Sequence, residues 1–143
     1  MKKEIVFIIL NYRQYILTVE AIQNILFLKG DIGIVVVDNN SNDGSYEKLC
    51  KIFKKYKKVK IFQNYKNTGY ANGNNFGVKK AYEIFNPDYI AIMNPDVRIH
   101  DKKIVLKLLD AFSKNNKIAI ATGIMLDINN KLSFANIAWK VQK

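Results

Sequence analysis

The sequence contains very little cysteine and few acidic residues. Cys50 is the single cysteine among 143 residues, so an internal disulfide framework and a cysteine-based zinc cluster are both excluded. No stretch approaches the roughly 20 apolar residues that a membrane-spanning helix needs. The apolar run 5–10 follows a basic start and imitates a signal peptide, but it is too short and has no small-residue cleavage site. We therefore expect a cytoplasmic protein.

The shortage of acidic residues leaves a strongly positive chain. Twelve Asp and Glu stand against 23 Lys and Arg, which gives a formal net charge of +11. Such a charge favours anionic partners, namely nucleic acid, acidic lipid or phosphorylated small molecules, without choosing among them. The lysine-rich segment 54–58 closes a predicted helix, where it is either a solvated end or a peripheral contact with the inner face of an anionic membrane.

Apart from these shortages, the composition is that of an ordinary globular domain. About half of the residues (49%) are apolar and 24% are charged, which argues against disorder. Four short apolar runs read as buried strands, at residues 5–10, 34–37, 89–93 and 118–121. Residues 59–62 predict a shorter strand near a sheet edge. The segments 124–126 and 132–134 predict a hairpin, and Trp139 is expected to seal the edge of the core.

Helical spacing of apolar residues fills the gaps between these runs. It predicts helices over residues 14–28, 46–53, 78–85 and 104–112. Strands that alternate with helices form right-handed βαβ units. The fold class is therefore α/β, with a mainly parallel sheet and helices on both faces, and the whole chain 1–143 is expected to be one domain.

Polar residues recur where the predicted strands end. Asn11 and Tyr12 follow the first strand, Asp38 and Asn39 follow the second, and the segment 94–96 follows the run 89–93. In a parallel sheet these ends share one edge, so their side chains should meet in a single crevice. Each motif taken alone is equally consistent with a turn. Together they favour a shared ligand.

The polar segment 67–77 reads as a loop that leads into a helix. Gly73 and Gly77 stand where the helix should open, and each costs up to about 1 kcal/mol relative to alanine. Glycine tolerates close approach of a ligand, and exposed amides at a helix start favour an anion. We expect this segment to line the ligand site; the alternative is a plain loop with a frayed first turn.

These motifs, in this order, resemble the family 2 glycosyltransferases, and most closely their rhamnosyltransferase-like branch. The matching segments are Asn11-Tyr12, the run 37–45 (VDNNSNDGS), the run 67–77 (NTGYANGNNFG) and the run 93–96 (MNPD). The resemblance extends over nearly the whole chain. It implies the GT-A fold and Mg²⁺ or Mn²⁺ as cofactor. It also implies a nucleotide-diphosphate-sugar donor, such as a UDP- or dTDP-sugar, and an acceptor that is a cell-surface polysaccharide or a lipid-linked saccharide.

The resemblance also implies roles for single residues. Tyr12, next to Asn11, would pack near the base, and Asp38 and Asn39 would contact the base or ribose. Gly69 and its neighbours would line the nucleotide crevice. The last group follows the strand 89–93: Asp96 would be the metal ligand and Asn94 would act through water. Hard cations take oxygen ligands and often bind only one or two protein carboxylates.

One expected residue is missing. Inverting members of the family resemble one another in a later carboxylate that deprotonates the acceptor hydroxyl, whereas Asp127 is the only acid here after Asp110. Asp127 falls at a predicted turn, so the catalytic base is unknown. The chain then reads as the donor-binding part of an inverting, metal-assisted glycosyltransferase that lacks its acceptor-side C-terminal part, or as a nucleotide-sugar-binding module without transfer.

Other readings have weaker support. A nucleic-acid binder rests on the net charge alone, without any specific recognition motif. A nucleotidyltransferase would need a phosphate-binding loop after the first strand, which the sequence does not show. If the fold is cut short, self-association of an exposed apolar face is a further expectation.

Overall fold

A computed structural model describes residues 2–127, 129 and 131–134. The chain separates into two compact units, Met1–Lys103 and Ile104–Lys143. The expectation of one domain over the whole chain stays a prediction. Among the described residues, no helix combines the length and apolar character that crossing a bilayer requires.

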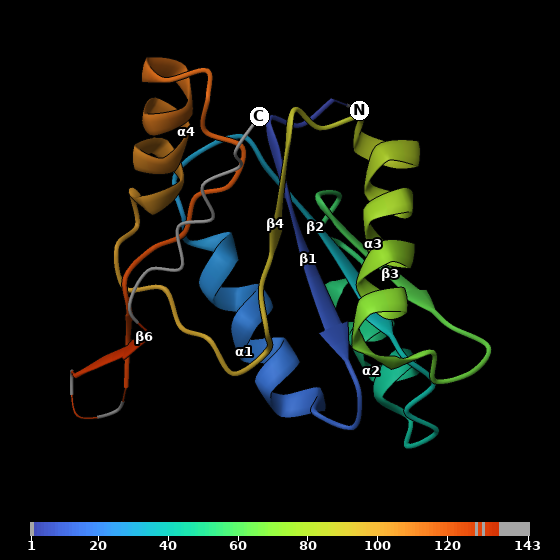
Figure 1. Ribbon diagram of the computed structural model, residues 1–143. Coiled ribbons are helices and arrows are strands. Elements are labelled where there is room, and N and C mark those ends of the chain that lie inside the picture. The colour runs from blue at the N-terminus through green and yellow to red at the C-terminus, as the bar shows by residue number, and fades with distance from the viewer. Residues whose placement is uncertain (1, 128, 130, 135–143) are drawn as a thin grey trace. The chain divides into compact units, whose positions relative to one another are not determined.

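The first unit is built on a four-stranded sheet in which all strand pairs are parallel (Figure 1). Its elements follow in the order β1 (Ile5–Asn11), α1 (Tyr15–Leu26), β2 (Ile32–Asp38), α2 (Ser45–Phe53), β3 (Val59–Gln63), α3 (Gly69–Phe85) and β4 (Tyr89–Ile92). The strand order is β3-β2-β1-β4. Asn11 is paired with Asp38 and Asp38 with Gln63, so the polar ends of three strands lie side by side.

Helices cover both faces of this sheet, as the sequence predicts. The chain moves outward from β1 through β2 to β3 and then returns to β4 at the other edge, so right-handed crossovers place α1 and α2 on one face and α3 on the opposite face. Figure 1 shows α1 and α3 on opposite sides of the strands. Because both faces are covered, β1 and β2 are buried along nearly their whole length.

The strand β4 is less buried than its sequence suggests. The apolar run 89–93 predicted a strand buried on both faces, but β4 is only partly buried and the Ile92 side chain is 54% exposed. The reason is position: among the described strands β4 pairs with β1 alone, so it is an edge. The edge position predicted for β3 is confirmed.

The helix α3 packs unusually close to the sheet because of two glycines. A methyl group at Gly73 would lie 2.5 Å from Leu10 Cδ1, and one at Gly77 would lie 2.6 Å from Ile8 Cγ2. The prediction that these glycines line the ligand site is therefore wrong, and so is the prediction of a loop through residue 77, since α3 begins at Gly69. Their four-residue spacing places both on the buried face of one helix.

The first helix differs in one detail from its predicted pattern. Thr18, Ala21, Ile22 and Ile25 form its buried face. Ile16 falls at the same helical spacing as Ile22 and Ile25, but it is 68% exposed. It lies in the first turn, beyond the end of the sheet, where nothing covers it among the described residues.

The second unit contains α4 (Ile104–Lys114) and an antiparallel pair, β5 (Met125–Leu126) and β6 (Leu132–Phe134). This pair confirms the predicted hairpin. The strand predicted at residues 118–121 is wrong: that segment is irregular and Ile120 is 83% exposed, so the apolar run does not enter a sheet. Asp127 Oδ1 accepts the backbone N–H of Lys131 at 2.9 Å, which confirms a turn role. Trp139 lies outside the described residues.

Candidate functional site

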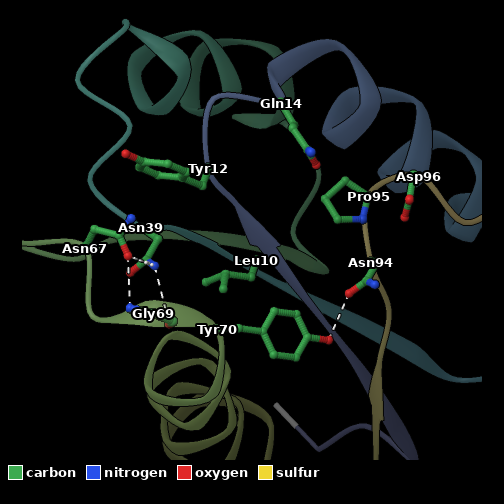
Figure 2. A pocket seen from close by; sticks show the side chains of 10 residues that line it. All are labelled: Leu10, Tyr12, Gln14, Asn39, Asn67, Gly69, Tyr70, Asn94, Pro95 and Asp96. Atoms are coloured by element: carbon green, nitrogen blue, oxygen red, sulfur yellow. Dashed lines mark hydrogen bonds between the residues drawn. The ribbon is translucent and has the colours of Figure 1, made fainter.

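A pocket of about 380 Å³ lies in the first unit at the carboxyl edge of the sheet (Figure 2). It is open to solvent and lined by residues from the ends of β1, β2 and β4 and from the start of α3. The lining residues are Leu10, Tyr12, Gln14, Asn39, Asn67, Gly69, Tyr70, Asn94, Pro95 and Asp96. The convergence of strand ends on one crevice, predicted from the order of the motifs, is what the structure shows.

The segment between β1 and α1 supplies one wall of the pocket. Tyr12 is 40% exposed, and the Arg13 guanidinium carbon lies 5.3 Å from the centroid of its ring. Arg13 has a left-handed backbone (φ 57°) and its Nε donates to the Ser41 carbonyl oxygen at 3.2 Å. The Arg13 guanidinium therefore lies over the ring of Tyr12, and Tyr12 also lines the pocket, where an aromatic ring can stack on a planar group.

Asp38 is fully buried beneath this wall and does not line the pocket. Its carboxylate accepts hydrogen bonds from Asn11 Nδ2 at 2.7 Å, from the Ser41 backbone N–H at 3.0 Å and from Ser41 Oγ at 2.6 Å. Asn11, equally buried, accepts the Thr18 hydroxyl through Oδ1 at 2.8 Å. These contacts join the loops after β1 and β2 to the start of α1, so Asp38 and Asn11 serve to hold the wall.

The next residue, Asn39, joins the opposite wall. Its Oδ1 accepts Asn64 Nδ2 at 2.9 Å and the Thr68 backbone N–H at 3.3 Å. Its Nδ2 donates to Asn67 Oδ1 at 2.8 Å and to the Gly69 carbonyl oxygen at 3.4 Å. The side chain is only 2% exposed. It ties the segment between β3 and α3 to the end of β2.

The first turn of α3 reaches across the pocket. Gly69 has φ 78°, which favours glycine, and its backbone N–H donates to Asn67 Oδ1 at 2.9 Å. The Tyr70 hydroxyl then donates to Asn94 Oδ1 at 2.8 Å (Figure 2). This hydrogen bond links α3 to the segment after β4.

The segment that carries Asn94 and Asp96 is clamped from behind by α1. Arg98 donates to the Pro95 carbonyl oxygen at 2.7 Å and forms an ion pair with Glu20. Asn24 and Ile99 exchange two hydrogen bonds, of 2.8 and 2.9 Å. Asp96 itself is exposed, and its carboxylate has no hydrogen bond or ion pair to any residue that the structure describes.

The charge of the pocket is opposite to that of the chain. Asp96 is the only ionisable acid or base among the lining residues besides the two tyrosines, so the lining carries no cation although the chain has a net charge of +11. The described residues also contain no cluster of three or more His, Cys, Asp or Glu that could hold a metal alone. One free carboxylate fits a hard cation when water and a bound anion supply the remaining oxygen ligands.

A second hollow of about 420 Å³ lies on the other side of the same wall, lined by residues 13–17, Asp43 and Lys48. The hydrogen bond from the Ser45 hydroxyl, supported by the Ser45 backbone N–H, lowers the pKa of Asp43 below its ordinary value. Asp43 thus accepts the backbone N–H of Ser45, the first residue of α2, as a carboxylate. Lys48 Nζ lies 5.3 Å from the Tyr15 ring centroid.

The structure brings together five of the seven site residues named from the sequence: Tyr12, Asn39, Gly69, Asn94 and Asp96. Asn11 and Asp38 lie just beneath them. Sequence reasoning missed Leu10, Gln14, Asn67, Tyr70 and Pro95 as individual lining residues. Asn67 and Tyr70 flank Gly69 in a segment already expected to line the site, whereas no sequence signal distinguishes Leu10 from the rest of its strand.

The family model described as glycosyl transferase family 2 matches residues 5–137. The low-salt glycan biosynthesis hexosyltransferase Agl10 of Haloferax volcanii is 25% identical over 104 residues, which is 73% of this chain and 31% of that protein.

Several solved structures are similar to the chain, and two of them contain a nucleotide or a nucleotide sugar. The mannosyltransferase PcManGT of Pyrobaculum calidifontis, in complex with GDP-Man and Mn²⁺, has a TM-score of 0.67 at 18% identity, over 79% of this chain and 33% of that one. TarS 1–349 of S. aureus, in complex with UDP, has a TM-score of 0.66 at 14% identity, over 85% and 39%. At this identity the likeness shows the fold, which confirms the expected GT-A type. The chain spans about a third of the length of these relatives.

Proposed function

The chain belongs to glycosyltransferase family 2, and from that premise we propose that its pocket binds the nucleotide-diphosphate-sugar donor of a sugar transfer. The observation that carries the proposal is the convergence of Tyr12, Gly69 and Asp96 on one hollow of about 380 Å³. Related proteins of the same fold were solved with GDP-Man and with UDP, which supports a nucleotide sugar as the ligand. The base, proposed as uracil or thymine, lies against Tyr12, and the diphosphate lies toward Asp96.

A divalent cation, Mg²⁺ or Mn²⁺, is part of this proposal. The pocket lining has no cationic side chain to face a diphosphate, and Asp96 is its single free carboxylate. Asp96 would hold the ion together with water and diphosphate oxygens, a ligand set that hard cations favour. When bound, the ion neutralises the charge of the departing nucleoside diphosphate. Asn94 would contact the ion through water, the role that the resemblance implies for it, while its Oδ1 accepts the Tyr70 hydroxyl.

The proposed reaction is an inverting transfer to a saccharide or lipid-linked acceptor in polysaccharide biosynthesis. The bond between the anomeric carbon and the diphosphate oxygen breaks, a bond to the acceptor oxygen forms, and the hydroxyl proton passes to a base. No described residue of the pocket is assigned as that base: Asp96 is proposed for the metal, and Asp127 is engaged in its turn. This single-carboxylate pocket also favours the alternative of a nucleotide-sugar-binding module without transfer.

Thermal unfolding with a panel of ligands tests the binding site. UDP-, dTDP- and GDP-sugars are added with and without Mn²⁺, and we expect one nucleotide to raise the melting temperature only when the ion is present. Asp96→Ala should abolish this rise. Asp88→Ala is the matched control, because Asp88 is an exposed carboxylate at the opposite end of β4. A rise that Asp96→Ala leaves intact would contradict the metal assignment.

A second assay separates transfer from binding alone. The donor that stabilises the protein is incubated with candidate saccharide acceptors, and released nucleoside diphosphate is measured. Release that depends on the acceptor supports a transferase. Stabilisation without any release supports the binding module.

We further propose a cytoplasmic location with peripheral contact to the inner membrane face through Lys54, Lys55, Lys57 and Lys58. These lysines follow α2 and precede β3, so they lie near the amino ends of the strands, whereas the pocket lies at the carboxyl ends. Co-sedimentation with vesicles that contain anionic lipid, compared with neutral vesicles, tests the contact. Light scattering tests the proposed self-association.

A further inference from the structure

The amide of Asn67 has an orientation that its neighbours determine. Its Oδ1 accepts the Gly69 backbone N–H at 2.9 Å and Asn39 Nδ2 at 2.8 Å. A backbone N–H can only donate, so the atom facing Gly69 must be the oxygen. The Nδ2 group, with two N–H donors, is therefore on the other side of the amide. It has no hydrogen-bond partner among the residues that the structure describes, although Asn67 lines the pocket.

Asn39 is the residue that holds this orientation. Its own amide is assigned in the same way, because its Oδ1 accepts the Thr68 backbone N–H at 3.3 Å. Both N–H donors of Asn39 are used, by Asn67 Oδ1 and by the Gly69 carbonyl oxygen, and its Oδ1 is shared by Asn64 and Thr68. With 2% exposure and all polar atoms paired, Asn39 has no hydrogen-bonding capacity left for a ligand.

The place of Asn67 in the pocket decides what its donors can meet. Figure 2 shows Asn67 at the same end as Tyr12, whereas Asn94, Pro95 and Asp96 lie at the other end. In the proposed function the diphosphate lies toward Asp96 and the base toward Tyr12. At the base end, the two N–H donors of Asn67 can hydrogen-bond to a carbonyl oxygen of the base. They cannot hydrogen-bond to an amino group, which is itself a donor.

We propose that Asn67 reads the base of the donor nucleotide by donating an N–H to a ring carbonyl oxygen, and that Asn39 is the positioning residue that aims it. The inference rests on the nucleotide-sugar function proposed above. It selects bases that present a carbonyl oxygen (uracil, thymine or guanine) against bases that present an amino group at that place. In this proposal Asp38 and Asn39 build the hydrogen-bonded frame around Asn67.

Two pairs of nucleotides test the selection, because each pair exchanges a carbonyl for an amino group on one ring. These are UDP against CDP, and inosine diphosphate against ADP, titrated calorimetrically with Mn²⁺ present. We expect the native chain to bind one of the two pairs, and within that pair to bind the carbonyl nucleotide at least about fivefold more tightly than the amino nucleotide. This ratio of dissociation constants corresponds to one hydrogen bond that the amino nucleotide cannot form.

Asn67→Asp is the decisive variant. The new carboxylate still accepts the Gly69 N–H and Asn39 Nδ2, so the loop is kept, but both outward donors are replaced by an acceptor. The preference should reverse toward CDP or ADP. An unchanged preference in Asn67→Asp would overturn the inference while leaving the proposed function standing. Failure of the native chain to bind any nucleotide would overturn both.

Asn39→Asp tests the positioning role separately. It keeps the acceptor for Thr68 but loses the donors that hold Asn67, so the Asn67 amide can rotate. The carbonyl preference should then shrink toward one, with faster hydrogen exchange at the Gly69 amide, although Asn67 is still present. A reversed preference in Asn39→Asp would instead mean that Asn39 touches the base. Asn42→Asp adds the same charge at an exposed position of the same loop and should leave the preference unchanged.

Discussion

The Tyr70 hydroxyl donates a hydrogen bond of 2.8 Å to Asn94 Oδ1, and both residues line the pocket. Tyr70 belongs to the first turn of α3, which follows β3 at one edge of the sheet, and Asn94 follows β4 at the other edge. The bond therefore spans the sheet at the level of the proposed diphosphate.

Removing this bond should have little effect on stability. Both side chains are exposed, so Tyr70→Phe is expected to lower the free energy of unfolding by about 1 kcal/mol or less, as measured by urea denaturation. Tyr82→Phe is the control, since Tyr82 is an exposed tyrosine of the same helix outside the pocket. A loss well above that of Tyr82→Phe, beyond about 2 kcal/mol, would show that the bond organises the fold as well as the pocket.

The two glycines of α3 should respond differently to alanine. At Gly77 the added methyl meets Ile8 and Val37, whose branched, fully buried side chains cannot move away, so Gly77→Ala should destabilise by about 1–3 kcal/mol. At Gly73 it meets only the end of Leu10, which can rotate into the pocket. Gly73→Ala should therefore cost less stability but weaken nucleotide binding.

The control for both glycines is Asn75→Ala, at an exposed position of the same helix. Alanine has the higher helix propensity, so this change should be neutral or stabilising by a few tenths of a kcal/mol. Denaturation and nucleotide titration are measured on all three variants. Equal losses of stability in Gly73→Ala and Gly77→Ala would contradict the difference in the stiffness of their neighbours.

The carboxylates of Asp38 and Asp96 should have different roles, Asp38 in stability and Asp96 in ligand binding. Asp38→Asn replaces one carboxylate oxygen by an amide N–H₂ group, and both oxygens accept hydrogen bonds here, so at least one buried donor loses its acceptor. We expect a loss of about 2–3 kcal/mol in unfolding free energy. Asp96→Asn changes an exposed side chain and should stay within about 0.5 kcal/mol while abolishing Mn²⁺-dependent nucleotide binding. Similar stability of the two variants would contradict the buried role of Asp38.

Cys50 should be a slow thiol. Burial raises the pKa of the Cys50 thiol above its ordinary value, although a hydrogen bond with Tyr46 acts in the opposite direction. Iodoacetamide at pH 8 should therefore label the native protein several times more slowly than the protein unfolded in urea, because only the thiolate reacts. Equal labelling rates in the native and unfolded protein would contradict a raised pKa.

The same shift has a consequence for stability. Because the folded pKa is raised, the contribution of the neutral thiol is fully present below the unfolded pKa and is lost as the pH rises through the folded pKa. Cys50→Ser removes this titration. The difference in unfolding free energy between the native chain and Cys50→Ser should shrink at alkaline pH.

Local patterns in the sequence were enough for the order and type of the elements in the first unit. Continuous apolar runs such as 34–37 can be satisfied only in a strand covered on both faces, and strands alternating with helices leave a parallel sheet as the simple solution. Polar residues after each strand then had to share one edge. For the same reason Tyr12 and Asp96, 84 positions apart in the chain, could be expected at one site.

Other properties depended on neighbours that the sequence does not name. Whether an apolar run is covered is decided by what packs beside it, so run 89–93 became a half-exposed edge and run 118–121 formed no strand. A glycine in the sequence looks the same whether it makes room for a ligand or for a neighbouring side chain. Only the packing shows that Gly73 makes room for Leu10 and Gly77 for Ile8.

The different hydrogen-bond partners of Asp38 and Asn39 also could not be predicted from the sequence. Consecutive residues at the end of a strand point in opposite directions, so one was bound to face one neighbouring loop and the other the next. The sequence by itself determined that two hydrogen-bonding side chains stand at this strand end in a GT-A-type fold. Only the tertiary structure decided that their partners are Asn11 and Ser41 on one side and Asn67 and Gly69 on the other, because hydrogen-bond partners are set by distances between segments that are remote in the chain.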